Sequence, residues 1–151
     1  MRTDPSSEPR PLILVCDDEP AARRAVVRAL GSERYRFVES GDGRELLAQL
    51  EREARVDLVL LDLRMPGMDG MTALGHLVAL EMPPPVVVIT ADHSLRAAID
   101  AVRAGAADYL QKPYEIDELR LVVERVLATE HLRRDHNRLA EEVRALRGER
   151  R

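Results

Sequence analysis

The sequence has little cysteine, no long apolar run and no strong excess of either charge. Its single cysteine, Cys16, excludes a disulfide within the chain and fits a reducing compartment, so we expect a cytoplasmic location. No apolar stretch approaches the ~20 residues of a membrane-spanning helix, and the polar segment 1–11 lacks the apolar core of a secretory signal. We therefore expect a soluble protein without membrane contact. With 23 basic and 27 acidic residues, the net charge of -4 gives no bias toward nucleic acid, and we expect no direct nucleic-acid binding by this segment.

Apolar residues make up 45% of the 151-residue chain, which is enough for one domain of ordinary size with an extension. Five short apolar runs alternate with segments of helical periodicity. The runs predict strands over 12–16, 34–39, 57–61, 86–90 and 108–111. The other segments predict helices over 19–30 and 42–53, after Asp69 through Leu80, after Asp92 or Ser94 to Gly105, and from Glu115 onward. Because the central runs are apolar throughout, we predict an α/β fold, a doubly wound five-stranded parallel sheet in the flavodoxin-like order 2-1-3-4-5.

Polar side chains follow the ends of four of these strands. They comprise three carboxylates, a hydroxyl group and a lysine: Asp17 and Asp18, Asp62, Thr90, and Lys112. Parallel sheets place their ligands at the carboxyl ends of their strands, so these groups are expected to share one rim of the sheet. Asp62 also leads directly into a turn rich in proline and glycine, which carries its carboxylate out of a buried strand.

The same residues, in this order and spacing, resemble the receiver domain of two-component response regulators. The motifs that carry the resemblance are Asp17-Asp18, Asp62 with the segment 65–70, Thr90-Ala91, and the segment 104–113. The resemblance covers about 12–127 and implies a signalling role in place of a conventional enzyme activity. Such a domain takes a phosphoryl group from a sensor histidine kinase, and it would catalyse that transfer and its own dephosphorylation.

The resemblance also implies a role for each site residue. Asp62 would accept the phosphoryl group, and Asp18 and Asp62 would bind Mg²⁺ directly. The backbone carbonyl of Arg64 would add a third oxygen ligand, while Asp17 would act mainly through water. Magnesium suits this site because it binds through a few carboxylates and waters, and because the charge on the peripheral phosphoryl oxygens needs a cation.

Three further groups would respond to the phosphoryl group. By the same resemblance, Lys112 would contact the phosphoryl oxygens as a point charge. Thr90 would donate its hydroxyl to the phosphoryl group. Tyr109 matches the aromatic switch of the family, which packs inward when the threonine moves toward the phosphate.

The segment 115–147 contains neither glycine nor proline and predicts one long helix. Its first part is expected to cover the sheet with Ile116, Leu119, Val122, Val123, Val126 and Leu127. Beyond it, leucines recur every seven residues, at Leu132, Leu139 and Leu146, with His136 and Val143 at the alternate positions. This pattern predicts a short coiled coil and a homodimer formed by the helix together with the receiver surface, although a charged single helix is the alternative.

We thus expect a disordered segment 1–11, a receiver domain over 12–127, and a helical extension over 128–151. A long charged helix directly after the receiver is similar to sigma-54-dependent transcription activators of the nitrogen-regulation type, in which the helix leads into an ATPase domain. A fragment of a longer transcription regulator is therefore expected. A stand-alone receiver without transcriptional output is the alternative within the family.

Two other classes of protein share some of these features. A phosphatase of the haloacid dehalogenase type also has an aspartate nucleophile, but it needs a second aspartate two residues later, where this chain has Arg64. A phosphorylation-independent interaction module usually loses an acid or the lysine. This chain retains all five groups of the rim, which favours a receiver that accepts phosphate.

Overall fold

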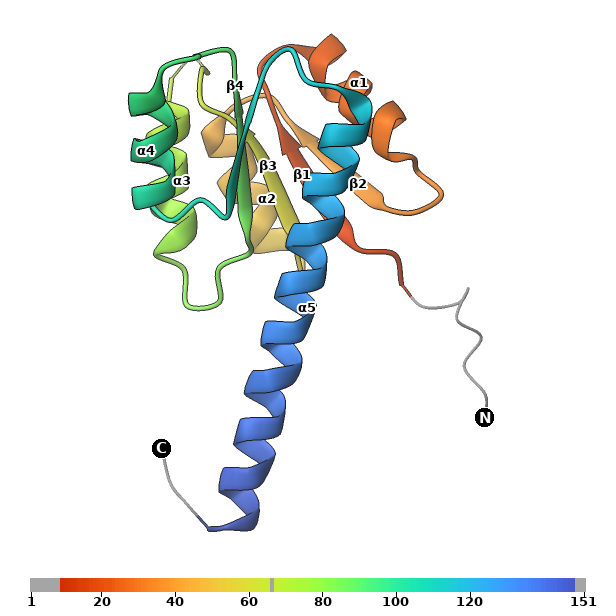
Figure 1. The fold of residues 1–151 in the computed structure, drawn as a ribbon, viewed down its shortest axis with the longest axis vertical. Coiled ribbons are helices and arrows are strands. Elements are labelled where there is room, and N and C mark those ends of the chain that lie inside the picture. Colours follow the sequence, from red (N-terminus) through yellow and green to blue (C-terminus); the bar gives the residue numbers. More distant parts are fainter. Residues whose placement is uncertain (1–8, 66, 149–151) are drawn as a thin grey trace.

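The computed structural model describes residues 9–65 and 67–148 (Figure 1). Five parallel strands form one sheet in the order β2-β1-β3-β4-β5, which confirms the predicted topology. The strands are β1 (Leu12–Cys16), β2 (Arg36–Ser40), β3 (Leu58–Asp62), β4 (Val86–Thr90) and β5 (Asp108–Gln111). The helices are α1 (Pro20–Leu30), α2 (Gly43–Arg52), α3 (Gly70–Val78), α4 (Leu95–Arg103) and α5 (Ile116–Leu146).

The sheet separates two apolar cores. Alternate residues of β1 point to opposite sides: Ile13 and Val15 join the core under α1 and α5, while Leu14 joins the core under α2, α3 and α4. Every residue of β1, β3 and β4 is buried. These strands are covered on both faces, which explains why their sequences show no alternation of apolar and polar residues.

Two helix caps that the sequence indicates are present. The carboxylate of Asp69 accepts a hydrogen bond from the backbone N–H of Thr72 at 2.7 Å, and the hydroxyl of Ser94 accepts one from Ala97 at 3.1 Å. Of the two candidates for the second cap, Ser94 is therefore the one used. Both caps start a helix just after the sheet edge where the polar strand ends lie.

Most elements begin or end within one or two residues of the expected positions, and three differences affect the pairing or burial of particular residues. Strand β2 begins at Arg36, because the N–H of Tyr35 still bonds to the carbonyl of Gly31 in the preceding turn. Helix α3 ends at Val78, so Leu80 lies in the turn after it and is 43% exposed. Ile116 does not cover the sheet: it is 52% exposed at the start of α5, and burial begins one turn later.

Helix α5 first packs on the sheet and then extends away from it (Figure 1). Its contact with the domain reaches beyond Leu127, because Arg134 forms an ion pair with Asp57 at 3.1 Å. The other carboxylate oxygen of Asp57 accepts a hydrogen bond from the N–H of Leu12 at 2.8 Å. Asp57 therefore ties the extension to the amino-terminal ends of β1 and β3. None of the described helices has the length and apolar character needed to cross a membrane.

Gly70 allows the loop after β3 to close tightly on itself. Its N–H donates to the carbonyl of Leu63 at 3.0 Å. A Cβ atom at this position would lie 2.3 Å from the Cα of Leu63 and 2.7 Å from the carbonyl oxygen of Asp62. Both neighbours are backbone atoms and cannot rotate away, so any side chain at position 70 must displace the end of β3.

We predict that Gly70→Ala lowers the free energy of unfolding by at least ~2 kcal/mol, because the new methyl group overlaps the backbone. Gly75→Ala is the matched control in the same helix, since nothing lies within 4 Å of a Cβ there. It should raise stability by ~0.5–1 kcal/mol through helix propensity. Urea denaturation measures both changes, and equal effects of the two substitutions would contradict the steric argument.

Candidate functional site

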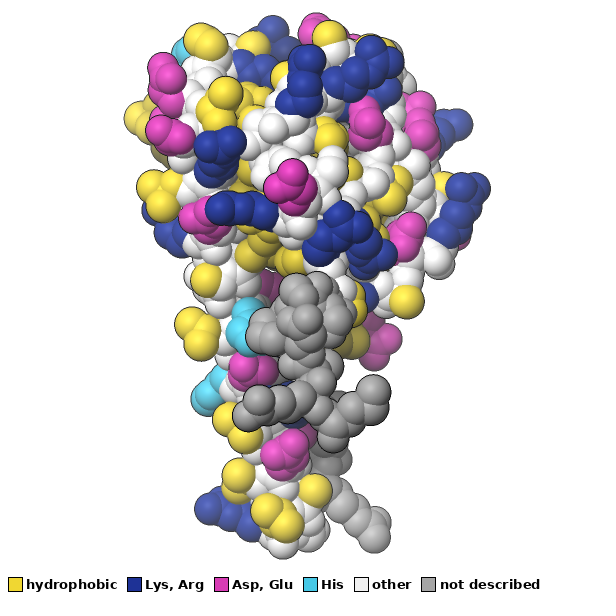
Figure 2. Space-filling view, turned by 90° about the vertical axis from the view of Figure 1, so that its right-hand side faces the viewer, with side chains coloured by type: hydrophobic (Ala, Val, Ile, Leu, Met, Phe, Trp, Pro, Cys, Tyr) yellow, Lys and Arg dark blue, Asp and Glu magenta, His cyan; other side chains and the backbone are white. Residues whose placement is uncertain are grey.

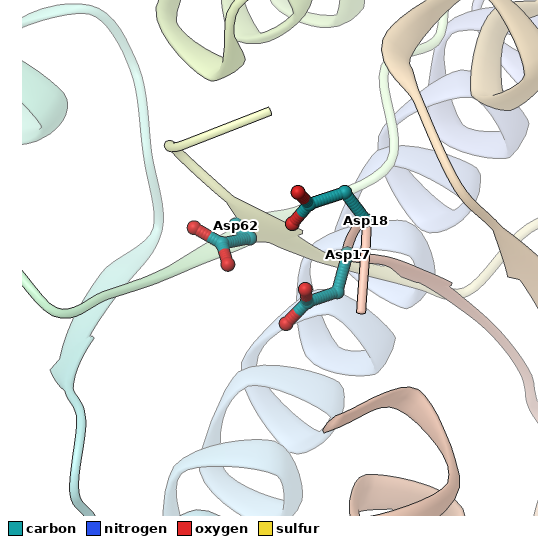
Figure 3. A group of neighbouring side chains, drawn as sticks. All are labelled: Asp17, Asp18 and Asp62. Atoms are coloured by element: carbon teal, nitrogen blue, oxygen red, sulfur yellow. The ribbon is translucent and has the colours of Figure 1, made fainter. Parts of the chain in front are cut away.

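Three carboxylates meet at the carboxyl ends of β1 and β3 (Figure 3). Asp17 and Asp18 follow β1, and Asp62 is the last residue of β3, its neighbour in the sheet. One oxygen of each carboxylate lies within 4.8 Å of the others. Asp17 and Asp62 are buried, whereas Asp18 is exposed. The carboxylates that the sequence predicts at one rim are thus brought together.

Lys112 provides the positive charge of this cluster. Its ammonium group lies 2.7 Å from Oδ2 of Asp17 and 3.0 Å from Oδ2 of Asp62. The backbone N–H of Lys112 donates to the carbonyl of Thr90 at 2.8 Å, which holds the end of β5 against β4. Burial alone would lower the pKa of Lys112, but its hydrogen bonds to Asp17 and Asp62 outweigh burial and raise it. The side chain therefore stays charged at neutral pH.

Asp62 ionises less readily than an ordinary aspartate. Burial raises its pKa, even though the backbone N–H of Arg64 donates to Oδ1 at 2.9 Å and Lys112 donates to Oδ2. The charge of Asp17 raises the pKa further. Three carboxylates thus face one ammonium group, and the site keeps an excess of negative charge.

The donor set of this cluster fits a hard divalent cation. Mg²⁺ binds oxygen ligands and usually retains several waters, so a few carboxylates at an exposed edge are sufficient. Asp18 is open to solvent and gives such an ion access to the site. The carboxylates of Asp17, Asp18 and Asp62 are the groups that could hold it. The backbone N–H of Arg64 donates a hydrogen bond to the carboxylate of Asp62, and the side chain of Arg64 is exposed to solvent.

Thr90 and Tyr109 are linked through a residue that the sequence suggested only as a possible helix cap. The hydroxyl oxygen of Thr90 accepts a hydrogen bond from the N–H of Asp92 at 3.2 Å. The hydroxyl of Tyr109 donates to the carbonyl of the same Asp92 at 2.6 Å. Thr90 is fully buried and Tyr109 half-buried. Both hydrogen bonds involve backbone atoms of Asp92, so the type of side chain at this position could not indicate them.

Cys16 lies in the core beside the site. It is buried at the end of β1, and its thiol lies 3.3 Å from the sulfur of Met65. Burial, together with the nearby charges of Asp42 and Asp17, raises the pKa of the thiol to about 12. The thiol therefore stays protonated and unreactive, as expected for a small core residue. In the neighbouring segment 65–70, Pro66 lies outside the described residues.

Comparison with known proteins agrees with this geometry. The family described as "Response regulator receiver domain" matches residues 13–124. Regulatory protein AtoC of Escherichia coli (strain K12) is 37% identical over 123 residues, which is 82% of this chain and 26% of that protein. The DNA-binding transcriptional regulator NtrC of Salmonella typhimurium is 38% identical over 119 residues, 79% of this chain and 25% of that protein. The chain thus spans about a quarter of the length of these relatives.

Solved structures show the same relationship. NtrX from Brucella abortus, crystallised with ADP, has a TM-score of 0.80 and 34% identity, covering 86% of this chain and 30% of that one. The isolated receiver domain of the same protein has a TM-score of 0.72 and 35% identity, covering 78% of this chain and 98% of that one. The prediction of a receiver is confirmed: the chain belongs to the response regulator receiver family, and its relatives include transcriptional regulators.

Proposed function

We propose that this chain is a phosphorylation-controlled switch in which Asp62 accepts a phosphoryl group from a sensor histidine kinase. Receiver domains are phosphorylated by histidine kinases and bind Mg²⁺ at an acidic site. The observation that carries the assignment is the cluster of Asp17, Asp18 and Asp62 with Lys112 hydrogen-bonded to two of them. A histidine kinase presents its phosphoryl group in the cytoplasm, so this is where the proposed function places the chain.

Asp62 is the acceptor that the arrangement favours. It lies on β3, between the acids that follow β1 on one side and Thr90 at the end of β4 on the other. In the transfer, a carboxylate oxygen of Asp62 forms a bond to phosphorus while the bond from phosphorus to the histidine nitrogen breaks. The nitrogen keeps the electron pair and takes up a proton. The new phosphoryl oxygens would be neutralised by Lys112 and by a hydrogen bond from Thr90.

Asp18 and Asp62 would bind Mg²⁺ directly, with the backbone carbonyl of Arg64 as a further ligand. Asp17 would act through water, which is consistent with its burial and its ion pair with Lys112. When bound, the ion supplies positive charge that offsets the acidic cluster and the oxygens of the phosphoryl group. The raised pKa of Lys112 keeps a second cation available for those oxygens.

The hydrogen bonds around Asp92 support a route from phosphorylation to the surface. If the hydroxyl of Thr90 turns to a phosphoryl oxygen, its contact with the N–H of Asp92 must change. The carbonyl of Asp92 holds the hydroxyl of Tyr109, and α4 begins only three residues later at Leu95. The loop, the tyrosine and the start of α4 would therefore respond together.

The extension of α5 is the proposed dimer interface, together with the receiver surface. Apolar side chains line the stem below the receiver (Figure 2), and those of the predicted seam are exposed: Leu132, Leu139, Val143 and Leu146. Arg134 holds the helix to Asp57 of the domain. We propose a receiver over 12–127, with 128–151 linking it to a transcriptional output domain like those implied by the names of its relatives.

The first test of this function concerns the acceptor. Asp62→Asn should abolish labelling by acetyl phosphate, because an amide oxygen cannot form the acyl phosphate. A chelator should block labelling of the parent protein. Asp69→Asn is the matched control, since this acid lies in the same loop but only caps α3, and asparagine caps equally well. If Asp62→Asn is still labelled at the parental rate, another residue is the acceptor.

The second test concerns the switch. In the phosphorylated parent, amide exchange over 95–102 should change, whereas in phosphorylated Thr90→Ala it should not, because no hydroxyl remains to leave Asp92. Thr90→Ser keeps the hydroxyl and should restore the change. Hydrogen exchange with mass spectrometry, on samples phosphorylated to the same extent, measures the effect. A full response in the alanine variant would refute the coupling.

The third test concerns the dimer. Leu139→Glu should dissociate it, because each buried leucine contributes ~1.5–3 kcal/mol and a buried charge adds a penalty. Met82→Glu is the control, as it changes an exposed apolar residue outside α5. A chain ending at Asp135 keeps the Arg134 contact and should be a folded monomer. Sedimentation equilibrium with and without beryllofluoride is the measurement, and a parent that is monomeric in both states would reduce α5 to a linker.

A further inference from the structure

Arg23 of α1 lies against the backbone of the acidic cluster. One terminal nitrogen of its guanidinium donates to the backbone carbonyl of Asp17 at 2.7 Å. Its Nε forms an ion pair with Glu39 of β2 at 3.1 Å, and the side chain is only 17% exposed. We propose that Arg23 is a positioning residue that fixes the orientation of Asp18 for Mg²⁺. This inference rests on the proposed metal site and adds a residue to it.

The carbonyl that Arg23 holds belongs to the peptide group that joins Asp17 to Asp18. A peptide group is planar, so fixing its carbonyl also fixes the direction in which the chain enters Asp18. Asp17 has other contacts: its N–H donates to the carbonyl of Ser40 at 3.1 Å, and its Oδ1 accepts from the N–H of Glu19 at 3.0 Å. Among the described residues, none hydrogen-bonds to the Asp18 carboxylate. The orientation of Asp18 is therefore fixed through the backbone, by the hydrogen bond from Arg23 to the carbonyl of Asp17.

An arginine suits this position better than a lysine. The guanidinium is planar and presents donors in different directions, so it can hold Glu39 and the Asp17 carbonyl at the same time. A lysine ammonium at the same depth would have to reach both acceptors from a single atom. Glu39 in turn fixes the guanidinium, which links the acidic loop to β2 as well as to α1.

This arrangement orients Asp18 before a metal ion arrives. An acid that is already oriented loses less conformational freedom on binding, so affinity is higher. Without Arg23, the loop would have to be ordered when Mg²⁺ binds, and the affinity for Mg²⁺ would fall. Arg23 forms no hydrogen bond or ion pair with Asp62, Lys112 or Thr90, so the rate of phosphoryl transfer at saturating Mg²⁺ should not change.

The test compares Mg²⁺ binding by the parent chain with binding by Arg23→Gln and Arg23→Lys. The chain contains no tryptophan, so isothermal calorimetry is the direct measurement. Arg23→Gln should weaken Mg²⁺ binding about tenfold, which corresponds to ~1.4 kcal/mol. Arg23→Lys should give a smaller loss. Arg34→Gln is the matched control, because Arg34 pairs with Glu124 at 3.3 Å on the exposed surface and should leave Mg²⁺ binding unchanged.

Labelling by acetyl phosphate provides a second readout. In Arg23→Gln, the Mg²⁺ concentration for half-maximal rate should rise by the same factor, while the plateau rate matches the parent. An unchanged Kd, or a lower plateau with unchanged half-saturation, would overturn the proposal, since a merely structural residue behaves in this way. If Arg23→Gln does not fold in thermal melts, Arg23→Lys decides by the same criteria. A parent chain that binds no Mg²⁺ would instead refute the metal site itself, before any substitution is made.

Discussion

The main electrostatic constraint on this fold is that three carboxylates are held together at the edge of the sheet against their mutual repulsion. Two unit charges 4 Å apart repel by about 4 kcal/mol at an effective dielectric constant of ~20. The strands that carry these acids are buried along their whole length, and each fully buried leucine contributes ~1.5–3 kcal/mol. The two apolar cores therefore outweigh the repulsion at the strand ends, and Lys112 reduces what remains.

The same constraint connects the site to the rest of the domain. Lys112 directly follows the edge strand β5, and its backbone N–H is hydrogen-bonded to Thr90 on β4, while the acids lie at the ends of β1 and β3. A change of charge at Asp62 would therefore alter the electrostatic interactions at the ends of four strands. The loop from Thr90 to Ser94 is held mainly by hydrogen bonds that involve Asp92 and has little apolar burial, so we expect it to respond to such a change.

The sequence predicted the strand order and the cluster of acids for a physical reason. Runs such as 12–16 and 58–61 are apolar throughout, and parallel topology then brings their polar ends to one edge. Contacts of the backbone could not be read in this way: the carbonyl of Asp92 binds Tyr109, and that of Asp17 binds Arg23. Every residue has a backbone carbonyl, so the residue type does not indicate which carbonyl accepts such a bond. The ends of β2 and α3 were misplaced because they depend on turn geometry, which periodicity does not report.

The ion pair between Asp57 and Arg134 gives α5 a defined direction as it leaves the domain. Asp57 directly precedes β3, and Asp62 ends the same strand, so the proposed acceptor and the anchor of the extension lie at opposite ends of one buried segment. The anchor also holds the start of β1 through the N–H of Leu12. A buried strand is stiff along its axis, because its neighbours are close-packed on both faces. The extension is thus attached to a strand that is buried along its whole length, and we expect any motion of α5 relative to the acidic cluster to come from the helices and loops around that strand.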